Sequence, residues 1–166
     1  TYLKDGDYII GLYNINTIQY VLVFTNMGNY LFLPVHEIPE VKWKDLGKHV
    51  SNIVSLASEE NIVSCLPVYD FEKEQYITIF TKNGMVKRTK LNEFKALRYS
   101  KPIVCIKLKD DDKVVDISFN TDKYVFVSTN NGYGLTYKLS EIPVVGLKTS
   151  GVKSIGLKND FVVSST

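Results

Sequence analysis

Basic side chains gather in the middle of this 166-residue chain, where they could bind a polyanion. Residues 74–119 contain ten basic and six acidic residues, although the net charge of the whole chain is only +2. Lysine and arginine neutralise phosphates and release counterions, which gives salt-sensitive binding without sequence preference. The pattern therefore indicates a phosphate-binding surface, and the plainer alternative is a solvated charged face. Six basic residues lie within fifteen positions: Lys87, Arg88, Lys90, Lys95, Arg98 and Lys101.

The chain lacks the residues that metal binding, nucleophilic catalysis or cofactor binding would need. Cys65 and Cys105 are isolated thiols, and His36 and His49 are the only histidines. We therefore expect no metal site and no Cys–His nucleophile, and we interpret the cysteines as buried hydrophobic residues of a reduced protein. Asp110–Asp112 lacks the glycine and glutamate of a calcium loop and is predicted to form a hairpin turn. Without a glycine-rich phosphate loop or a nucleophile elbow, the chain alone is predicted to be no enzyme and to bind no cofactor.

The elements that must position the basic residues repeat three times, over residues 19–28, 75–84 and 123–132. Each copy begins with Tyr, Val, Ile, Phe and Thr, which are typical of a half-buried strand. Each ends in Thr-x-x-Gly, where asparagine and glycine permit the tight turn of a hairpin. The separations of 56 and 48 residues between the glycines are typical of propellers and solenoids. Second strands are therefore predicted over residues 29–35, 85–91 and 133–139.

Each repeat is predicted to supply four strands, and no segment shows helical periodicity over more than a turn or two, so the fold class is all-β. In the first repeat the strands are expected near residues 19–25, 29–35, 50–56 and 61–68. Residues 1–17 match the end of a repeat, so we interpret them as closing strands of a preceding blade, with residues 1–12 paired into it. The three repeats are then assigned to residues 18–73, 74–119 and 120–166 of one domain.

One aromatic position recurs in the repeated strand, as Tyr20, Tyr76 and Tyr124. Because tyrosine combines a large apolar ring with one polar atom, we predict that these side chains are buried at contacts between repeats. A catalytic role for them is not expected. No apolar run is long enough to cross a bilayer and no signal peptide is recognisable, so a cytoplasmic protein without membrane contact is the default expectation.

The repeated pattern resembles the C-terminal domain of the A subunit of bacterial type IIA topoisomerases, over essentially the whole chain. Phe-Thr-Asn-Met-Gly at residues 24–28, followed by Glu-Ile-Pro at residues 37–39, is similar to the topoisomerase IV version more than to that of gyrase. Thr-Lys-Asn-Gly-Met-Val-Lys-Arg at residues 81–88 resembles the family repeat closely. The glutamine-arginine-glycine box that is specific to gyrase is absent, and the first repeat has Leu31 where the second has Lys87.

The resemblance implies a β-pinwheel, a propeller-like disc of four-stranded antiparallel blades in which neighbours exchange strands. Such a disc normally has five or six blades, so this chain would be a partial one of about three. Duplex DNA would bend around a basic outer rim and be presented to the catalytic core for ATP-dependent strand passage. The implied partners are double-stranded DNA, the ATPase B subunit and the rest of the A subunit, with ATP and magnesium bound by other domains in the bacterial cytoplasm.

The predicted DNA-contacting residues come from all three repeats, with most in the second. The main alternative is a propeller that recognises a protein and binds no nucleic acid. Basic groups on one continuous rim would favour DNA, whereas scattered charges around an apolar patch would favour a protein partner. The full predicted set is Lys42, Lys44, Lys48, Lys82, Lys87, Arg88, Lys90, Lys95, Arg98, Lys101, Lys138, Lys148 and Lys153.

Overall fold

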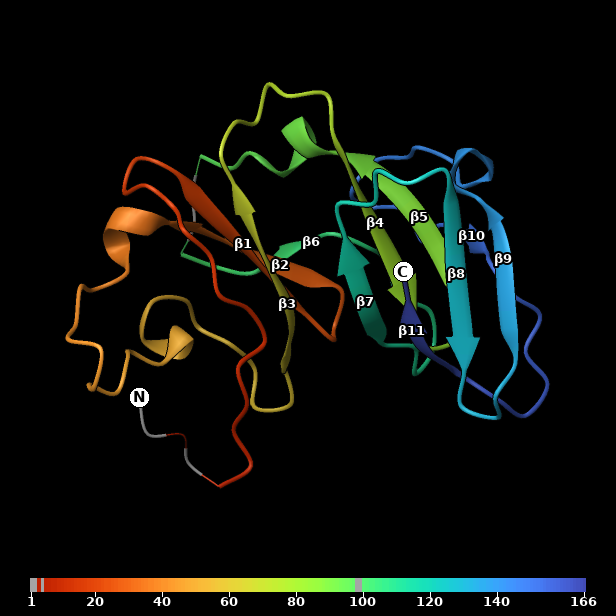
Figure 1. The fold of residues 1–166 in the computed structure, drawn as a ribbon, viewed down its shortest axis with the longest axis horizontal. Helices are drawn as coiled ribbons and strands as arrows, with labels where there is room; N and C mark the ends of the chain where they lie inside the picture. Colours follow the sequence, from red (N-terminus) through yellow and green to blue (C-terminus); the bar gives the residue numbers. More distant parts are fainter. Residues whose placement is uncertain (1–2, 4, 98–99) are drawn as a thin grey trace.

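The computed structural model describes residues 3, 5–97 and 100–166, which form three antiparallel sheets set side by side (Figure 1). The first sheet has the order β3 (Ile62–Val68), β1 (Tyr20–Thr25), β2 (Asn29–Pro34), β6 (Ile103–Val104). The second has the order β7 (Val114–Ser118), β4 (Tyr76–Thr81), β5 (Met85–Lys90), β10 (Val152–Lys153). The third has β11 (Val162–Ser165), β8 (Tyr124–Thr129) and β9 (Gly134–Lys138). The all-β class and the repeated hairpins are as predicted.

The three sheets meet along one side. Strand β7 contacts both β3 and β11 and lies between them in Figure 1. These three strands therefore form the inner side of the array. The opposite side, made by β6, β10 and the residues that lead into and follow them, is called the outer rim below.

Neighbouring blades exchange strands at the outer rim. Strand β6 belongs to the second repeat in sequence but pairs with β2 of the first, with Asn29 opposite Val104. Strand β10 of the third repeat pairs in the same way with β5 of the second, with Met85 opposite Lys153. The blades and the sequence repeats therefore do not coincide, because each of the first two sheets is completed by the repeat that follows it.

The hairpin turns explain why the repeats fold alike. Gly28 and Gly84 have φ of +77° and +79°, a left-handed conformation that side chains other than glycine rarely adopt. A Cβ atom at Gly28 would also lie 2.7 Å from the Ile106 carbonyl oxygen. An acidic residue from later in the repeat closes the turn, as where Asp112 Oδ1 accepts a 2.8 Å hydrogen bond from the amide of Asn83. Residues 110–111 form a turn as predicted, but it is not a hairpin turn, because the strands on either side of it, β6 and β7, pair in different sheets.

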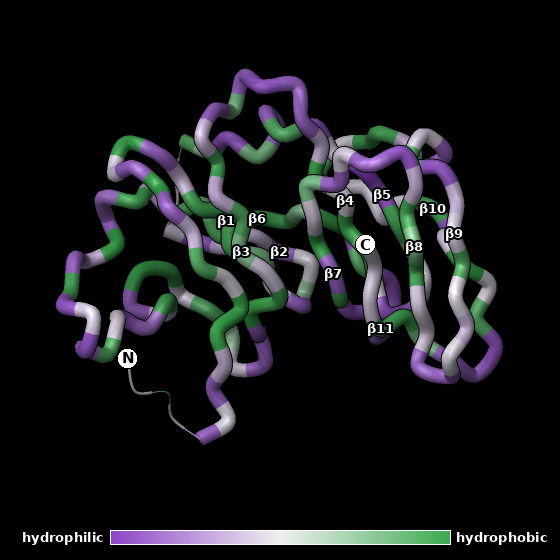
Figure 2. Tube along the Cα trace, viewed as in Figure 1, coloured by the Kyte–Doolittle hydropathy of each residue, from purple (hydrophilic) through white to green (hydrophobic). Residues whose placement is uncertain are grey.

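Apolar residues lie along the strands of the sheets (Figure 2), and their buried side chains form clusters between neighbouring sheets. Between the first two blades, the rings of Phe24, Tyr30 and Phe94 pack edge to face or tilted against one another. Between the second and third, Phe80 packs in a cluster that includes Val125. Four short 3-10 helices lie outside the sheets in the described residues: η1 (Val35–Glu37), η2 (Val50–Asn52), η3 (Leu91–Phe94) and η4 (Leu139–Glu141).

The strand predicted over residues 50–56 is wrong. This segment contains η2, which begins after His49, whose ring Nδ1 accepts a hydrogen bond from the Ser51 amide. A strand needs a partner edge, and β6 already occupies the outer edge of β2. The third sheet likewise departs from the prediction, since the described residues give it three strands instead of four.

The N-terminal segment is also not the strand that we predicted. Its described part, Leu3 and residues 5–12, contains no strand, and Leu12 is 94% exposed. Side chains tie the following residues to the inner edge instead, because Tyr13 Oη donates to the Cys65 carbonyl (2.8 Å) and Tyr69 Oη to that of Asn14 (3.1 Å). Two such bonds fix the path of the chain without forming a backbone ladder.

The recurrent tyrosines differ from the prediction because their surroundings differ. Tyr20 is half-buried and packs on the rings of Phe32 and Phe71. Tyr76 is half-buried beneath the Arg88 guanidinium, and Tyr124 is 49% exposed. A shared sequence position therefore does not give a shared burial in the three blades.

Candidate nucleic-acid interface

Strand β5 carries the basic cluster that the sequence pointed to, but Lys87 on it is fully buried. Its Nζ donates to the carbonyl oxygens of Gly146 and Leu147, both at 2.8 Å, and lies 3.5 Å from Thr149 Oγ1. An ammonium enclosed in this way does not reach a phosphate. The structure therefore removes Lys87 from the predicted DNA-contacting set, because a loop of the third repeat covers it.

Arg88 is half-buried and already partly engaged. Its Nε donates to the Ile142 carbonyl (3.0 Å), and its guanidinium carbon lies 5.5 Å from the centre of the Tyr76 ring. Lys90, at the end of β5, is exposed. Lys95 is exposed as well but lies 3.5 Å from the Glu72 carboxylate, so a negative charge already faces it.

The outer rim holds exposed lysines from the second and the third repeat. Lys101 leads into β6, Lys153 lies on β10, and Lys148 lies in the loop before β10. Lys107, which the prediction missed, follows β6, and its amide donates to the Thr149 carbonyl at 3.0 Å. This bond joins the rim of the first blade to that of the second. We call Lys101, Lys107, Lys148 and Lys153 the rim lysines.

A sequence signal for Lys107 existed. In Ile106-Lys107-Leu108-Lys109 lysines alternate with apolar residues, and the structure buries Ile106 while exposing Lys107. Such alternation is typical of an extended segment with one buried face. The sequence prediction treated this segment only as the end of a repeat, and that comparison does not show which of its side chains are exposed.

The remaining predicted residues are spread over other surfaces. Lys82 lies over the ring of Phe161, with its Nζ 4.7 Å from the ring centre, and Lys138 ends β9. The first-repeat loop exposes Lys42, Lys44 and Lys48, and Lys44 lies 4.9 Å from the ring centre of Trp43. Arg98 lies outside the described residues. All of these residues stay predictions.

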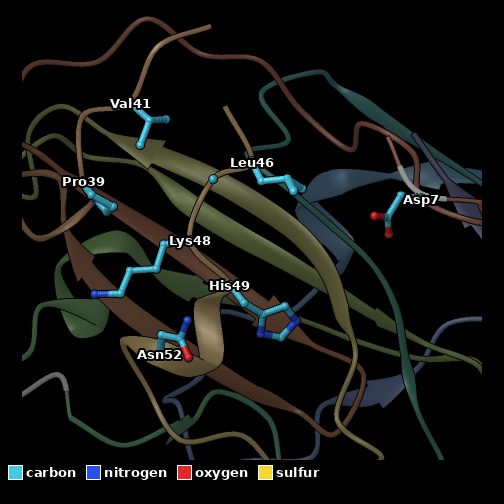
Figure 3. Close-up of a pocket in the computed structure, with 8 residues that line it drawn as sticks. Asp7, Pro39, Val41, Leu46, Lys48, His49 and Asn52 are labelled. Atoms are coloured by element: carbon cyan, nitrogen blue, oxygen red, sulfur yellow. The ribbon is translucent and has the colours of Figure 1, made fainter. Parts of the chain in front are cut away.

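The same first-repeat loop borders an open concavity of about 660 Å³. Figure 3 shows Asp7 of the N-terminal segment across from Pro39 and Val41, with Leu46 between them and His49 and Asn52 below. Among the described residues, no three His, Cys, Asp or Glu side chains gather where they could hold a metal ion. The concavity therefore offers no candidate metal centre among the described residues, and the rim is taken below as the candidate site.

Burial sets the protonation of the buried groups. It raises the pKa of Cys105 to about 12 and that of Cys65 to about 11, which keeps both thiols protonated and unreactive at neutral pH. Burial lowers the pKa of Lys87 to about 8, because a charged ammonium is disfavoured away from water. The burial that keeps Lys87 from a phosphate therefore also lowers its pKa.

The sequence of the chain matches the model of a known protein family in three segments. The family described as DNA gyrase C-terminal domain, beta-propeller, matches residues 19–68, 75–120 and 123–165. The chain belongs to this family. Its three matched segments overlap the three repeats recognised in the sequence, and the family's propeller fold agrees with the predicted propeller-like disc.

Relatives within the family are topoisomerase subunits. The chain is 43% identical over 164 residues to the A subunit of DNA topoisomerase 4 from Bacillus subtilis (strain 168), covering 98% of this chain and 20% of the relative. It is 42% identical over 163 residues to the same subunit of Staphylococcus epidermidis, covering 97% of this chain and 20% of the relative. The chain thus spans about a fifth of the length of these relatives.

Solved structures of the family superpose on this chain. The C-terminal domain of DNA topoisomerase IV is 44% identical with a TM-score of 0.94, over 99% of this chain and 51% of that one. The DNA gyrase A C-terminal domain is 26% identical with a TM-score of 0.72, over 99% and 53%. The E. coli ParC C-terminal domain, at 17% identity and a TM-score of 0.76 over 90% and 62%, shares the fold. The resemblance seen in the sequence is confirmed.

Proposed function

We propose that the chain binds duplex DNA without sequence preference on its outer rim and bends it, as an accessory domain of a topoisomerase IV A subunit. The observation that carries the proposal is the continuity of the rim lysines across two blades through the Lys107–Thr149 hydrogen bond. A duplex that crosses this junction meets positive charge from two repeats at once. The likeness to topoisomerase IV subunits supports the same assignment.

Phosphate contacts of this kind give affinity without reading bases. Each phosphate that a lysine neutralises releases condensed counterions, so binding weakens steeply as salt rises. Bending a 20–30 base-pair segment costs on the order of 1–6 kcal/mol by elastic estimates. Several lysines must therefore act together to hold the duplex curved, and a rim that joins two blades supplies them.

The chain would serve the reaction without carrying out its chemistry. In the proposed assembly the rest of the A subunit cleaves and rejoins the strands, the B subunit hydrolyses ATP with magnesium, and this domain presents the DNA in the bacterial cytoplasm. We expect the purified chain neither to nick supercoiled plasmid in magnesium nor to hydrolyse ATP. Magnesium-dependent nicking that disappears with a tyrosine substitution would contradict this division of labour.

The test is a salt titration of the four rim lysines replaced together by glutamine. Labelled duplexes of two unrelated sequences are titrated by fluorescence anisotropy between 50 and 200 mM salt. Each lost phosphate contact should lower the log–log salt slope by roughly 0.9, equally for both sequences. The control has the same charge change at four exposed lysines near acidic residues in sequence, Lys73, Lys95, Lys123 and Lys158. Equal losses in the two variants, or no binding by the parent at low salt, would overturn the proposal.

A second function is supported by a different surface. The third sheet exposes large apolar side chains on the outward face of β8 and on β11, and exposed apolar patches of this kind favour protein partners. A chain that binds no duplex at low salt would leave protein recognition by this surface as the remaining function. The exposed side chains are Tyr124, Phe126 and Val163.

A further inference from the structure

Lys87 combines two properties that rarely occur together, a fully buried side chain and a formal charge without a paired carboxylate in hydrogen-bond contact. Removing an ammonium from water is costly, and neutral carbonyl groups offset that cost only in part. The equivalent position is Leu31 in the first repeat and Leu135 in the third. A leucine thus fits this position of the strand, so the lysine supplies something other than packing.

The three groups that Lys87 binds lie in one loop, residues 146–149. The two carbonyl oxygens and the Thr149 hydroxyl all approach the same Nζ atom, so the ammonium fastens this loop to β5. The residues just before the loop have a separate attachment. Thr89 Oγ1 donates to the Val145 carbonyl, and the Val145 amide donates to the Arg88 carbonyl, both at 2.8 Å.

The fastened loop carries part of the outer rim. Lys148 is exposed within it, and the Thr149 carbonyl accepts the hydrogen bond from the Lys107 amide. The position of two rim lysines therefore depends on the loop. The loop in turn depends on Lys87, which itself touches no solvent.

We propose that Lys87 is a positioning residue for the DNA-binding rim: its buried ammonium holds loop 146–149 against β5 and so fixes Lys148 and Lys107 at the junction of the first two blades. The part that concerns DNA rests on the proposed function, whereas the attachment of the loop does not. Two titratable groups lie near the Lys87 ammonium, Glu93 and Cys105, and neither replaces the loop as its hydrogen-bond partner. Glu93 faces the loop, with Oε2 3.5 Å from the place of a Cβ at Gly146, and the Cys105 thiol is protonated.

Hydrogen exchange of the whole chain, followed amide by amide by NMR without DNA, tests the attachment. Lys87→Met keeps the length of the side chain and removes its donors, and Lys87→Leu introduces the residue that the other repeats have. In both variants the Lys107 amide, which bonds to Thr149, should exchange at least tenfold faster. The matched control is Thr89→Val on the same strand, which removes the bond to Val145 and should leave the Lys107 amide protected.

A mutant cycle tests the consequence for DNA. If Lys87 acts through Lys148, then Lys87→Met should weaken duplex binding by up to the ~8-fold at 0.1 M salt that one phosphate contact supplies, as Lys148→Gln should. In the Lys148→Gln background the same Lys87→Met change should weaken binding by less than it does in the parent, because only its effect through Lys107 remains. Circular dichroism and the unchanged exchange of amides in β8 show that the variants are folded.

The outcomes separate this proposal from the function on which it partly rests. A Lys107 amide that exchanges at the parent rate in both Lys87 variants overturns the proposal, whatever happens with DNA. So do Lys87 and Lys148 effects that multiply in the double variant, since they would be independent. A parent chain that binds no duplex while its Lys87 variants lose protection at Lys107 overturns the DNA-binding function and upholds the attachment of the loop.

Discussion

The hydroxyl of Thr25 donates a 2.6 Å hydrogen bond to Glu60 Oε1, across 35 residues of sequence. The same carboxylate oxygen accepts from Asn29 Nδ2 at 2.8 Å, so one side chain ties together both ends of the β1–β2 turn. Thr25 is fully buried, which makes an unpaired hydroxyl there costly. These two bonds connect the residues just before β3 to the β1–β2 hairpin of the same repeat.

Glu60→Ala should therefore destabilise the chain by about 2 kcal/mol, since hydrogen bonds to a charged group contribute roughly 1.5–3 kcal/mol. Urea unfolding followed by circular dichroism measures this difference. Glu59→Ala is the control, because Glu59 is exposed and engages Asn26 only through its backbone carbonyl. Similar midpoints for the two variants would show that the carboxylate of Glu60 contributes little.

The turn glycines give a comparison within one chain. Gly28→Ala introduces both a left-handed alanine and a Cβ only 2.7 Å from the Ile106 carbonyl, whereas Gly132 has φ of +85° and no atom within 4 Å of the place of a Cβ. Gly132→Ala should cost about 1–2 kcal/mol from conformation alone. Gly28→Ala should cost about 1–3 kcal/mol more from overpacking. Melting temperatures of the two variants should rank in this order, and the reverse order would contradict the packing of the exchanged strand on Gly28.

Much of this fold could be predicted from sequence because its signals are local. Alternating Tyr, Val, Ile and Phe residues that end in Thr-x-x-Gly specify β1, β4 and β8 and their turns. The exchange of β6 and β10 was expected only from the family resemblance. Pairing between strands from different repeats depends on which edge is free, and that is a property of the assembled sheets. The same reason accounts for residues 50–56, whose β-branched residues did not make a strand.

The site was predicted less well than the fold. The middle repeat was correctly recognised as basic, but the burial of Lys87 depends on a loop some 60 residues later that no local pattern reveals. Lys107 was missed for the opposite reason, since its exposure follows from an alternation that was present in the sequence. Charge density along a chain therefore located the right region, and only the packing of neighbouring blades determined which lysines reach the rim.

Both thiols should resist alkylation in the folded chain. Burial raises the pKa of Cys65 to about 11 and of Cys105 to about 12, so the reactive thiolate is scarce at pH 8. Intact mass spectrometry after an hour in iodoacetamide at pH 8 should show no adduct on the native chain and two adducts after unfolding in urea. Rapid modification of the native chain at Cys105 would mean that the contact between the first two blades opens readily.

The pH dependence of stability should carry a signature of Lys87. Its pKa is lowered from 10.5 to about 8 in the folded chain, because burial outweighs the effects of Cys105 and Glu93, which act to raise it. Between these values the unfolded chain binds the proton and the folded chain does not, so raising the pH stabilises the fold. The contribution is lost as the pH falls from 10.5 to 8, and its full size is up to ~3 kcal/mol.

Titration of Tyr30 and of both cysteines acts in the opposite direction, because burial raises their pKa values in the folded state. The parent is therefore compared with Lys87→Met, which retains these groups. Urea unfolding of both chains at pH 7, 8, 9 and 10 should give a free-energy difference, parent minus variant, that is constant from pH 7 to about 7.5 and then grows in favour of the parent. A difference that stays level to pH 10 would mean that the Lys87 ammonium is not held away from water, and the buried attachment of loop 146–149 would lose its physical basis.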